Sequence, residues 1–121
     1  MGIRQSEKLV HSEFKTNAEG WPTGGETYLN VEHPFFDDRD AMAIVWQDGI
    51  IGEGGQNGAF LEDVIEAARQ RLRFFQANSK TRCRENAIAL THLETALAWL
   101  DLRTRNRTVQ GVENSYEGHA E

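Results

Sequence analysis

The second half of the chain carries apolar residues at helical spacing in two segments, which predicts two helices over about residues 59–77 and 82–107. In the first segment these residues are Phe60, Leu61, Val64, Ile65, Ala68, Leu72 and Phe75, and in the second they are Ala89, Leu90, Leu93, Ala96, Leu97 and Leu100. Asn57 is placed to cap the first helix. The polar segment 78–81 separates the two helices, so the pattern predicts an antiparallel helical hairpin over residues 57–108.

The segment before this hairpin has strand-type composition. Thr27 to Val31 is typical of a strand. The run from Ala43 to Trp46 is followed by Asp-Gly and a second apolar pair, which predicts a β-hairpin across residues 43–52. Residues 26–56 are therefore expected to form a β-hairpin region.

The two ends of the chain show neither pattern. Residues 1–25 are polar and interrupted by glycine and Pro22, so we expect an irregular segment there. Residues 109–121 are polar and acidic and are expected to form a tail. The expected class is α+β, with a small antiparallel β region followed by a long antiparallel two-helix hairpin, in one structural domain.

Charge is divided unevenly along the chain. The net charge of the 121 residues is -6, but residues 1–63 hold twelve acidic and four basic residues, while residues 64–121 hold seven and nine. An acidic protein is a poor candidate for general DNA coating, which requires many neutralised phosphates. A few arginines in the second half still suffice for one small phosphorylated ligand.

Candidates for catalysis or metal binding are sparse. The four histidines are far apart and show no metal-ligand spacing, and Cys83 is the one cysteine. We therefore expect no catalytic residues, no metal and no cofactor. No apolar run approaches the roughly 20 residues of a membrane-spanning helix, so a cytoplasmic protein without membrane contact is expected.

Four residues of the predicted hairpin suit a nucleotide. Arg103 and Arg107 are four residues apart on one helix face, where two guanidinium groups can bind a pyrophosphate or a cyclic phosphodiester. Phe75 and Asn86 come opposite each other across the turn, where a ring stacks on a base and an amide reads its edge. The alternatives are a solvated, basic helix end for the arginines, and a core position for Phe75 beside a merely polar Asn86.

The hairpin resembles a known family. The segments Arg71–Gln76, Cys83–Thr91, Leu93–Leu100 and Arg103–Arg107, closing at Gly111–Glu113, are similar to the helical-hairpin domain of the Thoeris anti-defence phage sponges. Relatives of this hairpin also occur in anti-CBASS sponges. The similarity extends, less closely, to about residue 26 through Trp46–Gly49 and Asn57–Ala59.

This resemblance implies a phage protein that captures an immune signal in the infected bacterial cell without degrading it. The implied ligand is a glycocyclic isomer of ADP-ribose, with a cyclic di- or trinucleotide as the alternative. The resemblance also implies base stacking by Phe75, adenine recognition by Asn86 and phosphate binding by Arg103 and Arg107. A signal-degrading enzyme and a structural or DNA-associated hairpin protein are the competing hypotheses.

The spacing of these residues has a consequence for assembly. Asn86 and Arg103 are 17 residues apart on one predicted helix, which corresponds to roughly 25 Å at about 1.5 Å per residue. A ligand of the size of ADP-ribose does not span that distance comfortably. We therefore expect a homodimer or higher homo-oligomer in which each site is shared between chains.

Overall fold

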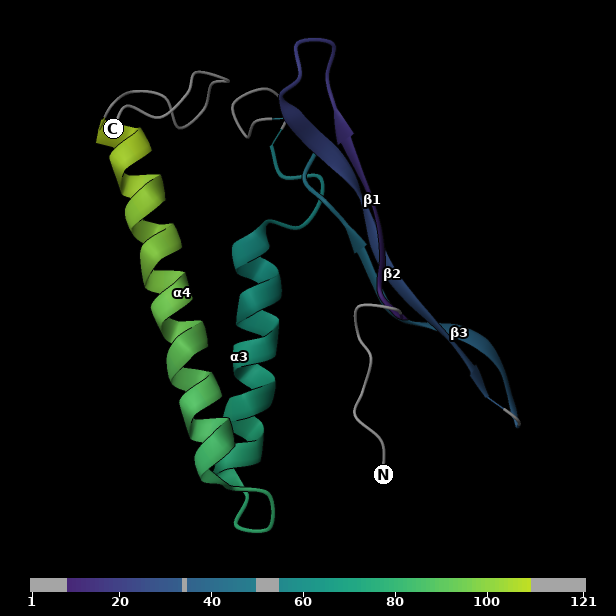
Figure 1. The fold of residues 1–121 in the computed structure, drawn as a ribbon, viewed down its shortest axis with the longest axis vertical. Helices are drawn as coiled ribbons and strands as arrows, with labels where there is room; N and C mark the ends of the chain where they lie inside the picture. Colours follow the sequence, from purple (N-terminus) through teal and green to yellow (C-terminus); the bar gives the residue numbers. More distant parts are fainter. Residues whose placement is uncertain (1–8, 34, 50–54, 110–121) are drawn as a thin grey trace. The chain divides into compact units, whose positions relative to one another are not determined.

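The computed structural model describes residues 9–33, 35–49 and 55–109 (Figure 1). Three strands precede two helices, and this confirms the α+β class. The elements are β1 (His11–Thr16), β2 (Pro22–His33), β3 (Phe36–Val45), α3 (Leu61–Ala77) and α4 (Arg84–Val109). The chain divides into two compact units, Met1–Ala59 and Phe60–Glu121, so the sheet and the helices are described separately.

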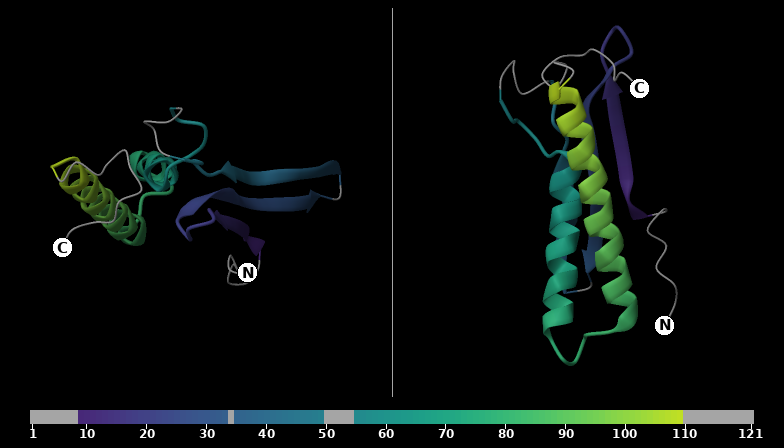
Figure 2. Two further views of the ribbon diagram at one scale, coloured as in Figure 1. Left: turned by 90° about the horizontal axis from the view of Figure 1, so that it is seen from above. Right: turned by 90° about the vertical axis from the view of Figure 1, so that its left-hand side faces the viewer.

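The three strands form one antiparallel sheet in the order β1-β2-β3 (Figure 2). In the register, Tyr28 of the central strand pairs with His11 on one side and with Ala43 on the other. The pairing of β1 with β2 is irregular between Phe14 and Thr16, next to Gly25. Gly25 has a φ of 122°, and a Cβ there would lie 2.0 Å from the carbonyl oxygen of Glu13. Glycine is therefore required at this bulge.

The expectation of an irregular segment over residues 1–25 is wrong for the part that is described. β1 lies inside this segment, and β2 begins at Pro22. Every side chain of β1 is exposed, so the strand has none of the apolar alternation that marks a half-buried strand. Proline is tolerated at the first residue of a strand, and Gly25 shapes the bulge instead of ending the strand.

The expected hairpin across residues 43–52 is also corrected. Ala43, Ile44 and Val45 pair with residues 26–28 of β2, so the hairpin is formed by β2 and β3. Gly49 has the positive φ expected after Asp48, at 85°, but it lies in the loop that follows β3. Residues 50–54 lie outside the described residues. The strand that pairs with β3 is therefore β2, which precedes it in the chain.

A chain of hydroxyl and indole groups connects the three strands. Thr27, only 7% exposed, shares a hydrogen bond of 2.8 Å with the hydroxyl of Ser12 in β1. The indole Nε1 of Trp46 donates to the same Thr27 oxygen, also at 2.8 Å. Leu29, two residues further along β2, is 9% exposed. The most buried part of the sheet is therefore the middle of β2, and its polar groups are satisfied.

The loop after β3 is held by the buried Gln47, which is 8% exposed. Its Oε1 accepts hydrogen bonds from the backbone N–H groups of Asn57 and Gly58, at 2.8 and 3.2 Å. Its Nε2 donates to the carbonyl oxygen of Gly55 at 3.0 Å. Asn57 in turn binds both backbone groups of Asp48, at 2.9 and 2.8 Å. The two segments 46–49 and 57–59 thus form one interlocked loop, completed by a parallel bridge from Trp46 to Ala59.

The first helix therefore begins later than expected. Asn57 is occupied with Asp48, and Phe60 takes the N-cap position of α3 without a side-chain cap. The carboxylate of Asp63 accepts a hydrogen bond from the backbone N–H of Phe60 at 2.9 Å, which is one half of a capping box. Glu62 and Asp63 in the first turn also suit the positive end of the helix dipole.

The helices α3 and α4 lie side by side, joined by the turn at residues 78–83 (Figure 1). Half-buried leucines, isoleucine and valine from the two predicted stripes mark the apolar side of each helix. These are Val64, Ile65 and Leu72 of α3 and Leu90, Leu93, Leu97 and Leu100 of α4. No residue of α3 is fully buried. The hairpin is therefore the predicted structure, but its apolar seam remains half open to solvent.

Candidate functional site

The turn end of the hairpin brings Phe75 and Asn86 to the same end of the unit, as their spacing predicted. Phe75 lies in the last turn of α3 and Asn86 in the first turn of α4, and both are half-buried. Thr81 connects them, because its hydroxyl donates to the Phe75 carbonyl oxygen at 2.8 Å and its own carbonyl lies 3.5 Å from Nδ2 of Asn86. The bond from Nδ2 is long, so the amide retains capacity to recognise a base edge.

Arg71 covers the aromatic pair at this end. Its guanidinium carbon lies 4.8 Å from the centroid of the Phe75 ring and 5.3 Å from that of Phe74. The two rings are 6.0 Å apart and tilted by 51°. One face of Phe75 is therefore in a cation–π contact. A stacking base must use another part of the ring or displace the guanidinium group.

Positive charge gathers around the same end. The exposed basic residues of the last turns of α3, the turn and the start of α4 are Arg71, Arg73, Lys80, Arg82 and Arg84. The sequence analysis assigned phosphate binding to Arg103 and Arg107 and did not recognise this basic group. The predicted antiparallel hairpin could have indicated it, because it places all five residues at the turn end. Such a concentration of like charge attracts an anion over a distance of about a Debye length.

Arg103 lies toward the opposite end of the hairpin, in contact with α3. Its Nη2 is 3.3 Å from Oε1 of Glu62, and the two side chains are 43% and 33% exposed. A phosphate group that binds Arg103 must share it with this carboxylate or displace it. Arg107 lies one turn further along α4, and its side chain is outside the described part of the structure.

The four predicted residues therefore form two groups that do not meet within one chain. Phe75 and Asn86 lie at the turn end, and Arg103 lies 17 residues after Asn86 along the single helix α4. The separation is roughly 25 Å at about 1.5 Å per residue. The continuity of α4 thus confirms the distance that led us to expect a shared site.

Between these ends, Arg69 connects the two helices. It contacts Glu66 one turn before it at 2.8 Å and Glu94 of α4 at 3.1 Å. The hydrogen bond to Glu94, helped by Glu66, raises the pKa of Arg69 above its usual value. Arginine is charged at every physiological pH in any case. This contact joins α3 to α4 between the two ends of the hairpin.

Two further observations concern the described residues alone. They contain no group of three histidine, cysteine, aspartate or glutamate side chains placed to hold a metal ion. None of the helices among them is long and apolar enough to span a bilayer.

Comparison with known proteins agrees with the fold and with the sequence resemblance. Residues 38–105 match the family described as "Acb2/Tad1, hairpin domain". The chain is also 49% identical over 74 residues to Thoeris anti-defense 1 of Bacillus phage SBSphiJ7. That alignment covers 61% of this chain and 51% of the phage protein, so the chain spans about half the length of this relative. The family match extends from near the start of β3 almost to the end of α4 and takes in more than half of the chain, which therefore belongs to the Acb2/Tad1 hairpin-domain family.

Proposed function

We propose that this chain is a phage anti-defence protein that binds and sequesters a small cyclic nucleotide immune signal without degrading it. The ligand is a glycocyclic isomer of ADP-ribose, and the protein acts in the cytoplasm of the infected bacterial cell. The observation that carries the proposal is the 49% identity to a phage protein named Thoeris anti-defense 1.

The turn end of the hairpin supports this proposal through its chemistry. Phe75 offers an aromatic ring for stacking, Asn86 offers an amide, and five exposed basic residues surround them. Base stacking on an aromatic ring is worth about 1–3 kcal/mol. The ring and the amide suit a purine base, and the surrounding basic residues suit a phosphate group of the same ligand.

Arg103 and Arg107 supply the phosphate contacts in this proposal. They lie on one face of α4 near its end, where two forked guanidinium groups bind a pyrophosphate through several hydrogen bonds. Since the two groups of residues do not meet in one chain, we assign each site to a homodimer or higher homo-oligomer. Phe75 and Asn86 of one chain then face Arg103 and Arg107 of another, without DNA or a cofactor.

Release of the ligand by heat tests capture against degradation. The purified protein is mixed with the glycocyclic ADP-ribose isomer in slight excess of sites, the free ligand is removed, and the protein is denatured at high temperature. Chromatography should recover the ligand intact and in stoichiometric amount. A product of altered mass in the supernatant would instead establish a signal-degrading enzyme.

A panel of ligands tests the choice of signal. Calorimetric titration with the ADP-ribose isomer, linear ADP-ribose, a cyclic dinucleotide and a cyclic trinucleotide should give tight binding for the first alone. A tight response to the cyclic di- or trinucleotides and none to the ADP-ribose isomer would move the assignment to the alternative signal class.

A further inference from the structure

The ring of Phe75 is covered on one face by an arginine of its own helix. Arg71 lies four residues before Phe75, so the helical spacing brings its side chain onto the ring. Its guanidinium carbon is 4.8 Å from the ring centroid. Phe75 is half-buried, whereas Arg71 is exposed. The covered face is therefore the one that opens to solvent when Arg71 moves, and a base reaches it only after that movement.

The contact of Arg71 with the ring is weak enough for a ligand to displace. A cation over an aromatic ring at an exposed position contributes about two- to fivefold to an equilibrium constant. In the part of the chain that the structure describes, no carboxylate forms an ion pair with Arg71, unlike Arg69 and Arg103. The guanidinium group therefore has hydrogen-bond donors to offer to an anion, and its flexible stem changes rotamer rapidly.

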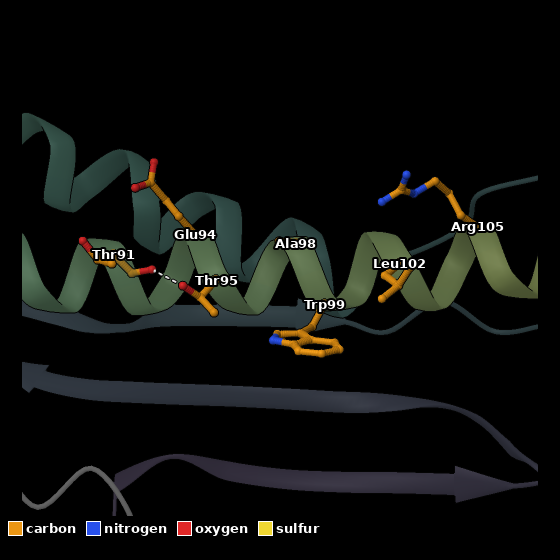
Figure 3. A pocket seen from close by; sticks show the side chains of 7 residues that line it. All are labelled: Thr91, Glu94, Thr95, Ala98, Trp99, Leu102 and Arg105. Atoms are coloured by element: carbon orange, nitrogen blue, oxygen red, sulfur yellow. Dashed lines mark hydrogen bonds between the residues drawn. The ribbon is translucent and has the colours of Figure 1, made fainter. Parts of the chain in front are cut away.

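The charge around Arg71 differs from the charge on the body of the hairpin. Residues 71–86 include five basic residues and one acidic residue. Further along α4, a hollow of about 450 Å³ has Glu94 and Arg105 in its lining, and Figure 3 shows both beside apolar side chains. These two opposite charges are each held in an ion pair. The excess positive charge at the turn end attracts a phosphate group, whereas the hollow has no such excess.

We propose that Arg71 determines specificity at the turn end. It covers Phe75 in the ligand-free protein, is displaced by the base of a purine nucleotide, and then donates hydrogen bonds to a phosphate group of the same ligand. This inference rests on the proposed function, because it takes Phe75 as the ring on which the base stacks. The cover lowers the affinity for every base, and only a phosphorylated ligand compensates for the lost cation–π contact. Neutral nucleosides are thereby excluded.

The two roles of Arg71 affect different ligands. Removal of the cover should strengthen the binding of any base by about two- to fivefold, the contribution of the cation–π contact. Removal of the phosphate contact should weaken the binding of a phosphorylated ligand by about tenfold or more, as for other hydrogen bonds to a charged group. Loss of the Arg71 side chain therefore changes the affinities for a nucleoside and for a nucleotide in opposite directions. A merely structural role would change both in the same direction.

Titration with adenosine and with ADP, followed by NMR so that weak binding is measurable, tests this difference. Arg71→Ala should bind adenosine about two- to fivefold more tightly than the wild type. It should bind ADP about twofold or more weakly, so the preference for ADP over adenosine falls about tenfold or more. Alanine at this exposed helical position retains the fold. The matched control is Arg73→Ala, which removes the same charge from another face of α3 and should leave adenosine binding unchanged.

The position of the Arg71 side chain is measured in the same spectra. Its Cδ protons lie near two aromatic rings in the ligand-free protein, since the guanidinium carbon is also 5.3 Å from the centroid of Phe74. Ring currents should therefore shift these protons upfield. Saturation with ADP should return them toward the values of an exposed arginine. An upfield shift that persists in the saturated complex shows that the base does not displace Arg71 and overturns the proposal.

The affinities decide the remaining outcomes. Equal changes for adenosine and ADP in Arg71→Ala, no change for either, or no binding of either by the wild type overturns the role of Arg71. A parallel titration with the glycocyclic ADP-ribose isomer separates this role from the proposed function. Tight binding of the isomer by the wild type and by Arg71→Ala alike upholds the function and overturns the role of Arg71. Opposite changes for adenosine and ADP, without binding of the isomer, uphold the role of Arg71 and overturn the choice of signal.

Discussion

Phe74 and Phe75 are neighbours in sequence, but their environments differ. Phe74 is 59% exposed, while Phe75 lies half-buried on the side of α3 that faces the turn and the start of α4. Arg71 contacts both rings. The residue that we propose to stack on a base, Phe75, is therefore distinguished by its neighbours Thr81 and Asn86 and not by its own chemistry.

This difference gives a prediction for the turn end. Phe75→Ala should weaken ligand binding by about 1–3 kcal/mol, or at least about fivefold, because one base stack is lost. Phe74→Ala is the matched control and should leave the dissociation constant unchanged. Calorimetric titration measures both, and thermal melting reports stability. A large fall in melting temperature for Phe75→Ala with unaltered affinity would show that the ring is merely part of the packing.

The ion pair of Arg103 with Glu62 gives a second prediction, since this carboxylate competes with a phosphate for the guanidinium group. An exposed ion pair contributes about 0–1 kcal/mol, so Glu62→Gln should tighten ligand binding by about two- to fivefold. Arg103→Ala should weaken it about tenfold or more, the value of a hydrogen bond to a charged group. Equal affinities for the wild type and both variants would remove Arg103 from the site.

At the scale of elements, the interlocked loop after β3 depends on particular residues for its conformation. Gln47 fills its amide capacity with backbone groups of residues 55–58. Gly58 passes so close to β3 that a Cβ would lie 2.5 Å from the Val45 carbonyl oxygen. The loop therefore requires a residue without a side chain at Gly58 and the amide side chain of Gln47.

Stability measurements test this interpretation of the loop. Gln47→Ala leaves partly buried backbone groups of residues 55–58 without their side-chain partner and should cost about 1–3 kcal/mol of the free energy of unfolding. Gly58→Ala should have a similar or larger effect, whereas Gly20→Ala is a control because a Cβ there meets nothing within 4 Å, although its φ of 89° adds strain. Chemical denaturation monitored by tryptophan fluorescence reports the change. A Gly58→Ala variant as stable as the wild type would show that the loop adjusts freely.

The elements differ in how far they can be predicted from sequence. The helices are found within about two residues because periodic apolar residues mark both, although Asn57 does not cap the first. β1 cannot be found, because its side chains are exposed and its pairing with β2 uses backbone groups that every sequence has. The pairing of β3 with β2 likewise could not be predicted, because no residue of β3 identifies its partner strand.

The candidate site shows the same division. The pairing of Phe75 with Asn86 follows from counting residues on either side of a turn, and the distance to Arg103 follows from helical rise. The contacts of Arg71 with Phe75 and of Glu62 with Arg103 do not, because they depend on rotamers and on the register of two helices. The roles of all four predicted residues in ligand binding remain predictions.

At the scale of the whole molecule, the decisive question is whether two chains build one site. A Phe75→Ala chain and an Arg103→Ala chain each lack one half of every site in a homodimer. If sites are shared, a mixture that exchanges subunits should form heterodimers with one intact site and one doubly damaged site. Titration of the equimolar mixture should then recover about a quarter of the wild-type sites at wild-type affinity, since roughly half of the dimers are mixed. Recovery of none, with subunit exchange demonstrated separately, would place the site within a single chain.

The open seam of the hairpin has a consequence for the backbone amides of the helices. No side chain of α3 is fully buried, and the large apolar side chains of α4 that are described are half-buried or exposed. Local opening therefore exposes little additional apolar surface, and its free energy is small in an isolated chain. Deuterium should enter the amides of α3 and α4 rapidly in dilute solution and more slowly as protein concentration rises. The amides of β2 around Thr27, which lie between two paired strands, should retain their hydrogens at every concentration.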